Sequence, residues 1–164
     1  MELILQEIDK AINAGFYYLS LAIALTLPDI CAALGAQNGQ TSKALFLNWY
    51  NQNLALKYPN ITAEDFYSLR CGVIHQGRMG HPKMQYSRVL FTVPNANRNV
   101  FHNNIIDDAL NLDICIFCKD VTGSVNEWFK QNQHDENIAR NLDLMVQPRP
   151  LGLAPYMVGM PLIA

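Results

Sequence analysis

The feature that most constrains the fold is the N-terminal stretch of residues 2–27, where apolar side chains recur at steps of three and four residues. These side chains are Leu5, Ile8, Ile12, Phe16, Leu19 and Ile23. Such spacing is typical of one face of an α-helix. The second half of the stretch is apolar nearly all round, and a helix of that kind has to be covered on every side. We therefore predict one long helix over residues 2–27 at the centre of the fold, ending or restarting at Pro28.

Four further segments have a helical pattern: residues 41–57, 62–76, 107–131 and 134–145. Thr41 or Ser42 is predicted to cap the first, Thr62 to cap the second, and Gly77 to end the second. Residues 86–95 and 98–106 are short β-branched and aromatic runs, which predict a small hairpin. The predicted fold class is mainly α, a four- to five-helix bundle with a small β-hairpin insertion before the long C-terminal helix.

The chain is long enough for one ordinary core, so residues 1–146 are predicted to form a single helical domain. Half of the residues are hydrophobic and 16% are charged, which favours a folded chain over a disordered one. Residues 147–164 hold four of the eight prolines and cannot form a continuous helix. Because this segment is too apolar for a solvated tail, we expect it to lie extended against the body or against a second subunit.

The N-terminus is acidic and lacks the basic region of a secretory signal, and the apolar pieces of residues 14–30 are too short to span a bilayer. We expect a cytoplasmic protein that has reduced thiols and no membrane segment. Cys115 and Cys118 have the spacing of half a zinc site, but no second pair of ligands matches them. Buried thiols are therefore expected there, with no metal and no cofactor.

Charge is distributed unevenly along the chain. The formal net charge is −2, yet residues 66–106 contain five Arg and Lys residues and no Asp or Glu. The segments on both sides of this span are acidic. A basic middle between acidic flanks is consistent with a local site for an anion, and also with basic side chains that solvate a loop.

Arg70 and His75 stand near the end of the helix predicted within "TAEDFYSLRCGVIHQGR" (residues 62–78). Histidine titrates near neutral pH, and arginine stays charged and can bind phosphate through two nitrogens. Five residues turn an ideal helix by about 140° and advance it by about 7.5 Å. The two side chains are thus expected to meet only if the helix unwinds at His75 or a two-fold dimer brings both pairs together. The alternative is structural: His75 stabilises the helix end, and Arg70 pairs with a carboxylate such as Asp65 or Asp120.

The Arg-x4-His spacing, on a helix that ends just after the histidine, resembles the signature of the HEPN superfamily. The resemblance covers roughly residues 1–131, including the later helix "LNLDICIFCKDVTGSVNEWF". It implies a small helical bundle that forms a homodimer, and either an RNA-binding protein or a metal-independent endoribonuclease in a toxin or defence role. It also implies RNA as the substrate and a protein partner such as an antitoxin. Within it, His75 would be the general acid/base and Arg70 the phosphate clamp.

Neighbouring residues complete the candidate site. Arg78, His81 and Lys83 follow in the loop and could contact phosphates, while Tyr67 could hydrogen-bond to the site or simply pack. The residue after the motif arginine is commonly polar in active HEPN proteins, whereas this chain has Cys71, which cannot orient an imidazole or a water as an amide does. The alternative function is therefore a non-catalytic helical module for dimerisation or protein interaction.

Overall fold

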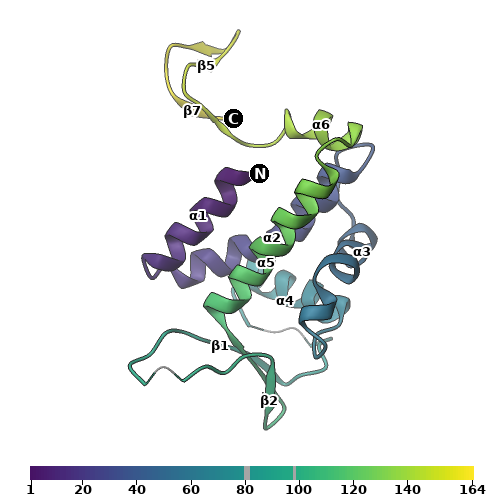
Figure 1. The fold of residues 1–164 in the computed structure, drawn as a ribbon, viewed down its shortest axis with the longest axis vertical. Helices are drawn as coiled ribbons and strands as arrows, with labels where there is room; N and C mark the ends of the chain where they lie inside the picture. The colour runs from purple at the N-terminus through teal and green to yellow at the C-terminus, as the bar shows by residue number, and fades with distance from the viewer. Residues whose placement is uncertain (80–81, 98) are drawn as a thin grey trace.

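The computed structural model describes residues 1–79, 82–97 and 99–164, and this part of the chain is mainly helical (Figure 1). Its helices are α1 (Glu2–Asn13), α2 (Tyr17–Gly35), α3 (Lys43–Asn53), the 3₁₀ turn η1 (Ala55–Lys57), α4 (Ala63–Gln76), α5 (Ile114–Asn132) and α6 (Glu136–Leu142). The predicted mainly α class is confirmed.

Helix α2 is the centre of the fold, because it packs against α1, α3, α4, α5 and α6. The prediction of one helix over residues 2–27 is wrong: Gly15, with φ of +80°, separates α1 from α2. Glycine adopts positive φ without a steric penalty, which allows the chain to turn there. Pro28 neither ends nor restarts α2, which runs through it to Gly35. Within the described residues, α2 is the one helix long and apolar enough to cross a membrane, and 56% of its most apolar window is buried inside the fold.

The β-structure differs from the predicted hairpin. Strand β1 (Arg88–Thr92) is parallel to β3 (Ala109–Asp113), and β2 (Asn104–Ile106) is antiparallel to β3, giving the order β1-β3-β2. The hairpin therefore joins β2 to β3, through Asp107 and Asp108, which have φ of 48° and 63°. Two consecutive residues of positive φ are typical of a tight hairpin turn.

Residues 109–113 were expected to be the start of the helix over 107–131, but they form a strand that is buried along its whole length. Its apolar residues Leu110 and Leu112 lead directly into the apolar stripe of the helix that follows, so the sequence pattern does not separate the strand from the helix, although Asn111 and Asp113 are polar. Helix α5 begins only at Ile114, where the side chain of Asp113 accepts a hydrogen bond from the Ile116 amide.

The core between these elements is aromatic as well as aliphatic. The rings of Phe66 in α4 and Phe117 in α5 stack at 5.8 Å, and Tyr50 lies 4.8 Å from Phe66. The Tyr50 hydroxyl donates a hydrogen bond to the carbonyl of Ile61, which satisfies a polar group inside the core. These contacts hold α4, the helix that carries Arg70 and His75, against the rest of the fold.

The segment over residues 147–164 folds back on itself and leaves many apolar side chains exposed. Strand β4 (Pro148–Arg149) pairs with β7 (Leu162–Ile163), and β5 (Gly152–Leu153) pairs with β6 (Met157–Val158). Figure 1 shows these strands beyond the N-terminal end of α1. Leu151, Tyr156 and Val158 are at least 72% exposed. The expected contact of this segment with a second subunit stays a prediction.

Candidate functional site

Helix α4, which carries the Arg-x4-His pair, begins and ends at the predicted residues. Its N-cap is Thr62, whose side chain accepts a hydrogen bond from the Asp65 amide, while the Asp65 carboxylate accepts one from the Thr62 amide. The helix ends at Gly77, which has φ of +64°. Both boundaries follow from local side-chain chemistry, a reciprocal capping box and a left-handed glycine.

Arg70 and His75 meet inside this one helix. Arg70 Nη1 lies 2.9 Å from His75 Nε2, and α4 is helical through Gln76. The expectation that the pair needs an unwound helix or a second subunit is therefore wrong. An arginine side chain is long enough to run along the helix surface and cover the rise between the two residues. The estimate from the rotation and rise of the helix considered the backbone alone and left this length out.

Asp29, on the neighbouring helix α2, is the carboxylate that holds Arg70. Arg70 Nε lies 2.7 Å from Asp29 Oδ2, with the two side chains 18% and 13% exposed. Both atoms are buried and have no other hydrogen-bond partner among the described residues. Burial raises the pKa of Asp29 above its ordinary value, and the charge of Arg70 offsets part of this rise. Thr41 Oγ1 lies 3.5 Å from the other oxygen, Oδ1.

Asp29 was not predicted as a site residue, although the sequence contained a signal for it. It is the one charged residue in α2, and a charge in an otherwise apolar core helix needs a partner from another element. The two carboxylates suggested from the sequence contact other groups. Asp65 accepts hydrogen bonds from Thr62 and Gln85, and Asp120 contacts Tyr58, Lys57 and His102.

The contact between Arg70 and His75 defines which ring nitrogen carries the proton. A guanidinium only donates hydrogen bonds, so Nε2 of His75 has to accept and carries no proton in this arrangement. His75 itself is exposed, whereas Arg70 is half-buried. The pair thus presents a basic imidazole nitrogen next to a fixed positive charge at the protein surface.

Tyr67 and Cys71 lie next to Arg70 on α4. Arg70 Cζ lies 6.0 Å from the centre of the Tyr67 ring, and Lys43 Nζ lies 5.5 Å from it. Cys71 Sγ lies 3.9 Å from Arg70 Nη1, and burial, with a hydrogen bond to Cys71, raises the pKa of Tyr67. Tyr67 therefore packs beneath two cations. Lys43, which was not predicted as a site residue, joins the site because α3 packs on α4.

The loop after α4 holds the remaining predicted substrate-binding residues. Arg78 is exposed and its Nε donates a hydrogen bond to the Gln76 side chain at 2.8 Å. Lys83 is also exposed, and His81 lies outside the described residues. The backbone amide and the side chain of Gln85 both bond to Asp65, which returns the loop to the start of α4.

Neither cysteine of the "CIFC" run lies in a metal-ligating cluster of the part of the chain that the structure describes. Burial raises the pKa of Cys118 to about 12, and it also raises the pKa of Cys115. A thiol has to lose its proton to bind a metal, and these shifts oppose that step.

The chain was compared with protein-family models, with curated protein sequences and with solved structures. None of the three comparisons found a match.

Proposed function

We propose that Arg70 and His75 form a phosphodiester site and that the protein is a HEPN-like, metal-independent endoribonuclease that acts in the cytoplasm. The observation that carries this proposal is the 2.9 Å contact between Arg70 Nη1 and His75 Nε2. It joins the two groups that metal-free RNA cleavage needs, a general base and a permanent cation.

The reaction follows from the two side chains. A phosphate that reaches Arg70 competes with His75 for Nη1, because a guanidinium binds phosphate strongly. Nε2 of His75 is then free to take the proton of the 2′-hydroxyl, whose oxygen attacks the adjacent phosphorus. The bond from phosphorus to the 5′-oxygen breaks, and that oxygen receives the proton that His75 had taken, leaving a 2′,3′-cyclic phosphate and a 5′-hydroxyl. Arg70 stabilises the charge that develops on the phosphorane oxygens.

Two features support a site for an anion at this position. The stretch from residue 66 to residue 106 has no acidic residue, so Arg70 and His75 lie in the basic part of the sequence. Arg78 follows directly after the helix and is exposed, where it can contact a neighbouring phosphate.

The alternative proposal is a non-catalytic interaction module, and the Asp29–Arg70 ion pair is the observation that favours it. A carboxylate 2.7 Å from Arg70 Nε neutralises part of the positive charge that a phosphate would need. In this second account, Arg70 joins α4 to α2, and His75 stabilises the end of α4. Cys71, at the position that is commonly polar in active HEPN proteins, also favours this second account.

An RNA cleavage assay distinguishes the endoribonuclease from the non-catalytic interaction module. Purified protein is incubated with labelled single-stranded RNA and EDTA, and His75→Ala is compared with wild type. We expect the substitution to lower the cleavage rate by about 10²- to 10⁴-fold, the usual contribution of a general acid or base. His134→Ala, which removes an exposed histidine between α5 and α6, is the matched control and should cleave at the wild-type rate.

The product ends provide an independent criterion. The proposed attack by the 2′-oxygen requires a cyclic phosphate product, and RNA with a 2′-deoxy residue at the cleaved position should stay intact. Equal rates for wild type and His75→Ala, or products with a 3′-hydroxyl, would contradict the nuclease proposal and leave the interaction module.

A further inference from the structure

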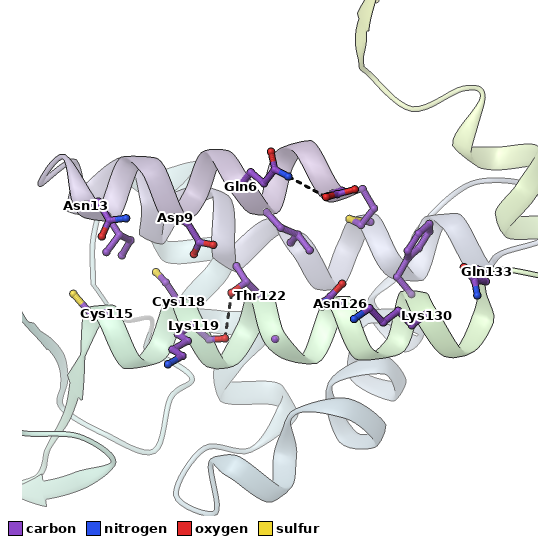
Figure 2. Close-up of a pocket in the computed structure, with 16 residues that line it drawn as sticks. Gln6, Asp9, Asn13, Cys115, Cys118, Lys119, Thr122, Asn126, Lys130 and Gln133 are labelled. Carbon is purple, nitrogen blue, oxygen red and sulfur yellow. Dashed lines mark hydrogen bonds between the residues drawn. The ribbon is translucent and has the colours of Figure 1, made fainter.

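A groove of about 850 Å³ runs between α1 and α5, away from the Arg70–His75 site. Figure 2 shows the two helices side by side and running in opposite directions, so that Asn13 and Cys115 lie at one end and Gln133 lies at the other. The groove is lined by apolar groups that are partly exposed, among them Ile12 and Phe129. None of its lining residues belongs to the candidate nuclease site.

The two sides of this groove carry opposite charges. Glu2 and Asp9 lie on the α1 side, and Lys119 and Lys130 lie on the α5 side. None of the four forms an ion pair within the described part of the chain. Because the helices are antiparallel, Asp9 and Lys119 lie toward the same end of the groove, and Lys130 lies toward the other (Figure 2). Glu2 is the first residue of α1 and therefore lies toward the same end as Lys130.

We propose that this groove is the contact surface for a second copy of the chain. A symmetric dimer has a two-fold axis in the plane of its interface, and the same patch is used twice. If the axis is parallel to the helices, α1 of one copy lies over α5 of the other. Each Asp9 then lies over the partner copy's Lys119, and each Glu2 over the partner copy's Lys130.

The charges select this arrangement over the other symmetric one. A two-fold axis perpendicular to the helices places α1 over α1 and α5 over α5, which brings acid against acid and base against base. Complementary charges set the orientation of a contact, while like charges in contact oppose the wrong one. Contact with a second copy would also cover the partly exposed Ile12 and Phe129, which supplies the apolar centre of the interface.

Gly123 lies in the wall of the groove, in the middle of α5. A Cβ placed on it meets no atom within 4 Å. The position therefore has open space above it, and a partner helix can approach the α5 backbone closely there. It also offers a position where a large side chain fills the groove without disturbing its own chain.

A charge-exchange experiment tests the proposed dimer. Asp9→Lys and Lys119→Glu are made separately, because both residues lie away from the helix ends, where Glu2 and Lys130 also act on the helix dipole. The dissociation constant is measured by analytical ultracentrifugation. Each variant alone should dissociate at least about tenfold more readily than wild type, because two attractive contacts become repulsive.

Mixing the two variants provides the decisive measurement. In a mixed dimer, the lysine introduced at position 9 of one chain faces the glutamate introduced at position 119 of the other. The second contact of the same dimer keeps the natural Asp9 and Lys119. We therefore expect the mixture to form dimers at the wild-type affinity, detected by native mass spectrometry. The double variant, Asp9→Lys with Lys119→Glu, should also dimerise, because both contacts are simply reversed.

Glu127→Lys is the matched control, since Glu127 is exposed on α5 and does not line the groove. It should leave the dimer unchanged. Gly123→Trp should abolish the dimer while its circular dichroism stays that of wild type. A monomeric wild-type protein would overturn the proposal, as would a mixture that stays monomeric or a dimer that tolerates Gly123→Trp. If the groove binds a different protein instead of a second copy, the wild-type protein should be monomeric.

Discussion

Among the single residues, Arg70 matters most, because its guanidinium contacts a different side chain on each of two sides. Its Nε lies against Asp29 and its Nη1 lies against His75. The first contact joins two helices, and the second assembles the candidate reactive pair. Asp29 thus sets the direction in which the guanidinium points, and Arg70 sets which nitrogen of His75 is unprotonated.

The raised pKa of Asp29 predicts how stability depends on pH. Burial is the main cause, so the folded protein holds this proton at a pH where the unfolded chain, near 3.8, has lost it. The contribution of Asp29 to stability is then greatest below that value and is lost as the pH rises through its folded-state pKa. Asp29→Asn should therefore gain stability relative to wild type as the pH rises through this range.

Urea unfolding of both proteins between about pH 3 and pH 7 measures this difference. Asp143→Asn, at an exposed carboxylate just after α6, is the control and should show no such trend. A relative loss of stability of Asp29→Asn with rising pH would mean that the attraction to Arg70 outweighs the cost of burying the Asp29 charge.

At the scale of elements, α4 is the segment that local chemistry describes best, whereas the strands are described least well. Thr62, Asp65 and Gly77 mark the ends of α4 through contacts within a few residues. In contrast, Leu110 and Leu112 of β3 continue into the apolar stripe of α5, and the pairing of β3 with β1 and β2 makes this segment a strand. Gly15 also divided a continuous apolar pattern into two helices.

The buried Asp65 carboxylate predicts a graded series of unfolding energies. It satisfies the amides of Thr62 and Gln85, and it is 4% exposed. Thr62→Ala should lower the free energy of unfolding by about 1 kcal/mol, the usual effect of losing an N-cap. Asp65→Ala should cost about 3 kcal/mol, because it leaves buried donors without a partner.

Chemical denaturation measures both values. Glu64→Ala is the control, since Glu64 forms an exposed ion pair with Lys43 and should change stability by less than about 1 kcal/mol. Equal effects of Thr62→Ala and Asp65→Ala would mean that the carboxylate contributes nothing beyond the cap.

At the scale of the whole molecule, α2 organises the helices, and the C-terminal segment contributes little to them. The four short strands of residues 147–164 pair with one another, and Arg149 donates an exposed hydrogen bond to the carbonyl of Asp143. By contrast, Asn141 of α6 donates to the carbonyls of Leu34 and Ala36, which satisfies the end of α2.

Deletion of residues 147–164 should therefore change the free energy of unfolding of the helices by no more than about 1 kcal/mol. The shortened protein should also keep the proposed dimer, because no residue after Gln133 lines the α1–α5 groove. Denaturation and ultracentrifugation of the shortened protein measure the two quantities. If the shortened protein is monomeric, the apolar C-terminal segment, and not the groove, joins the subunits.

The features that depend on near neighbours could be predicted from the sequence: the helical class, both ends of α4, and the placement of Arg70 and His75 on one helix. Caps and helical faces are decided by residues within a few positions of one another. Three features could not be predicted in this way: the contact of Asp29 with Arg70, the strand over residues 109–113, and the acidic and basic residues on opposite sides of one groove. Each of these depends on how separate elements pack, and packing brings together residues that are distant in the chain.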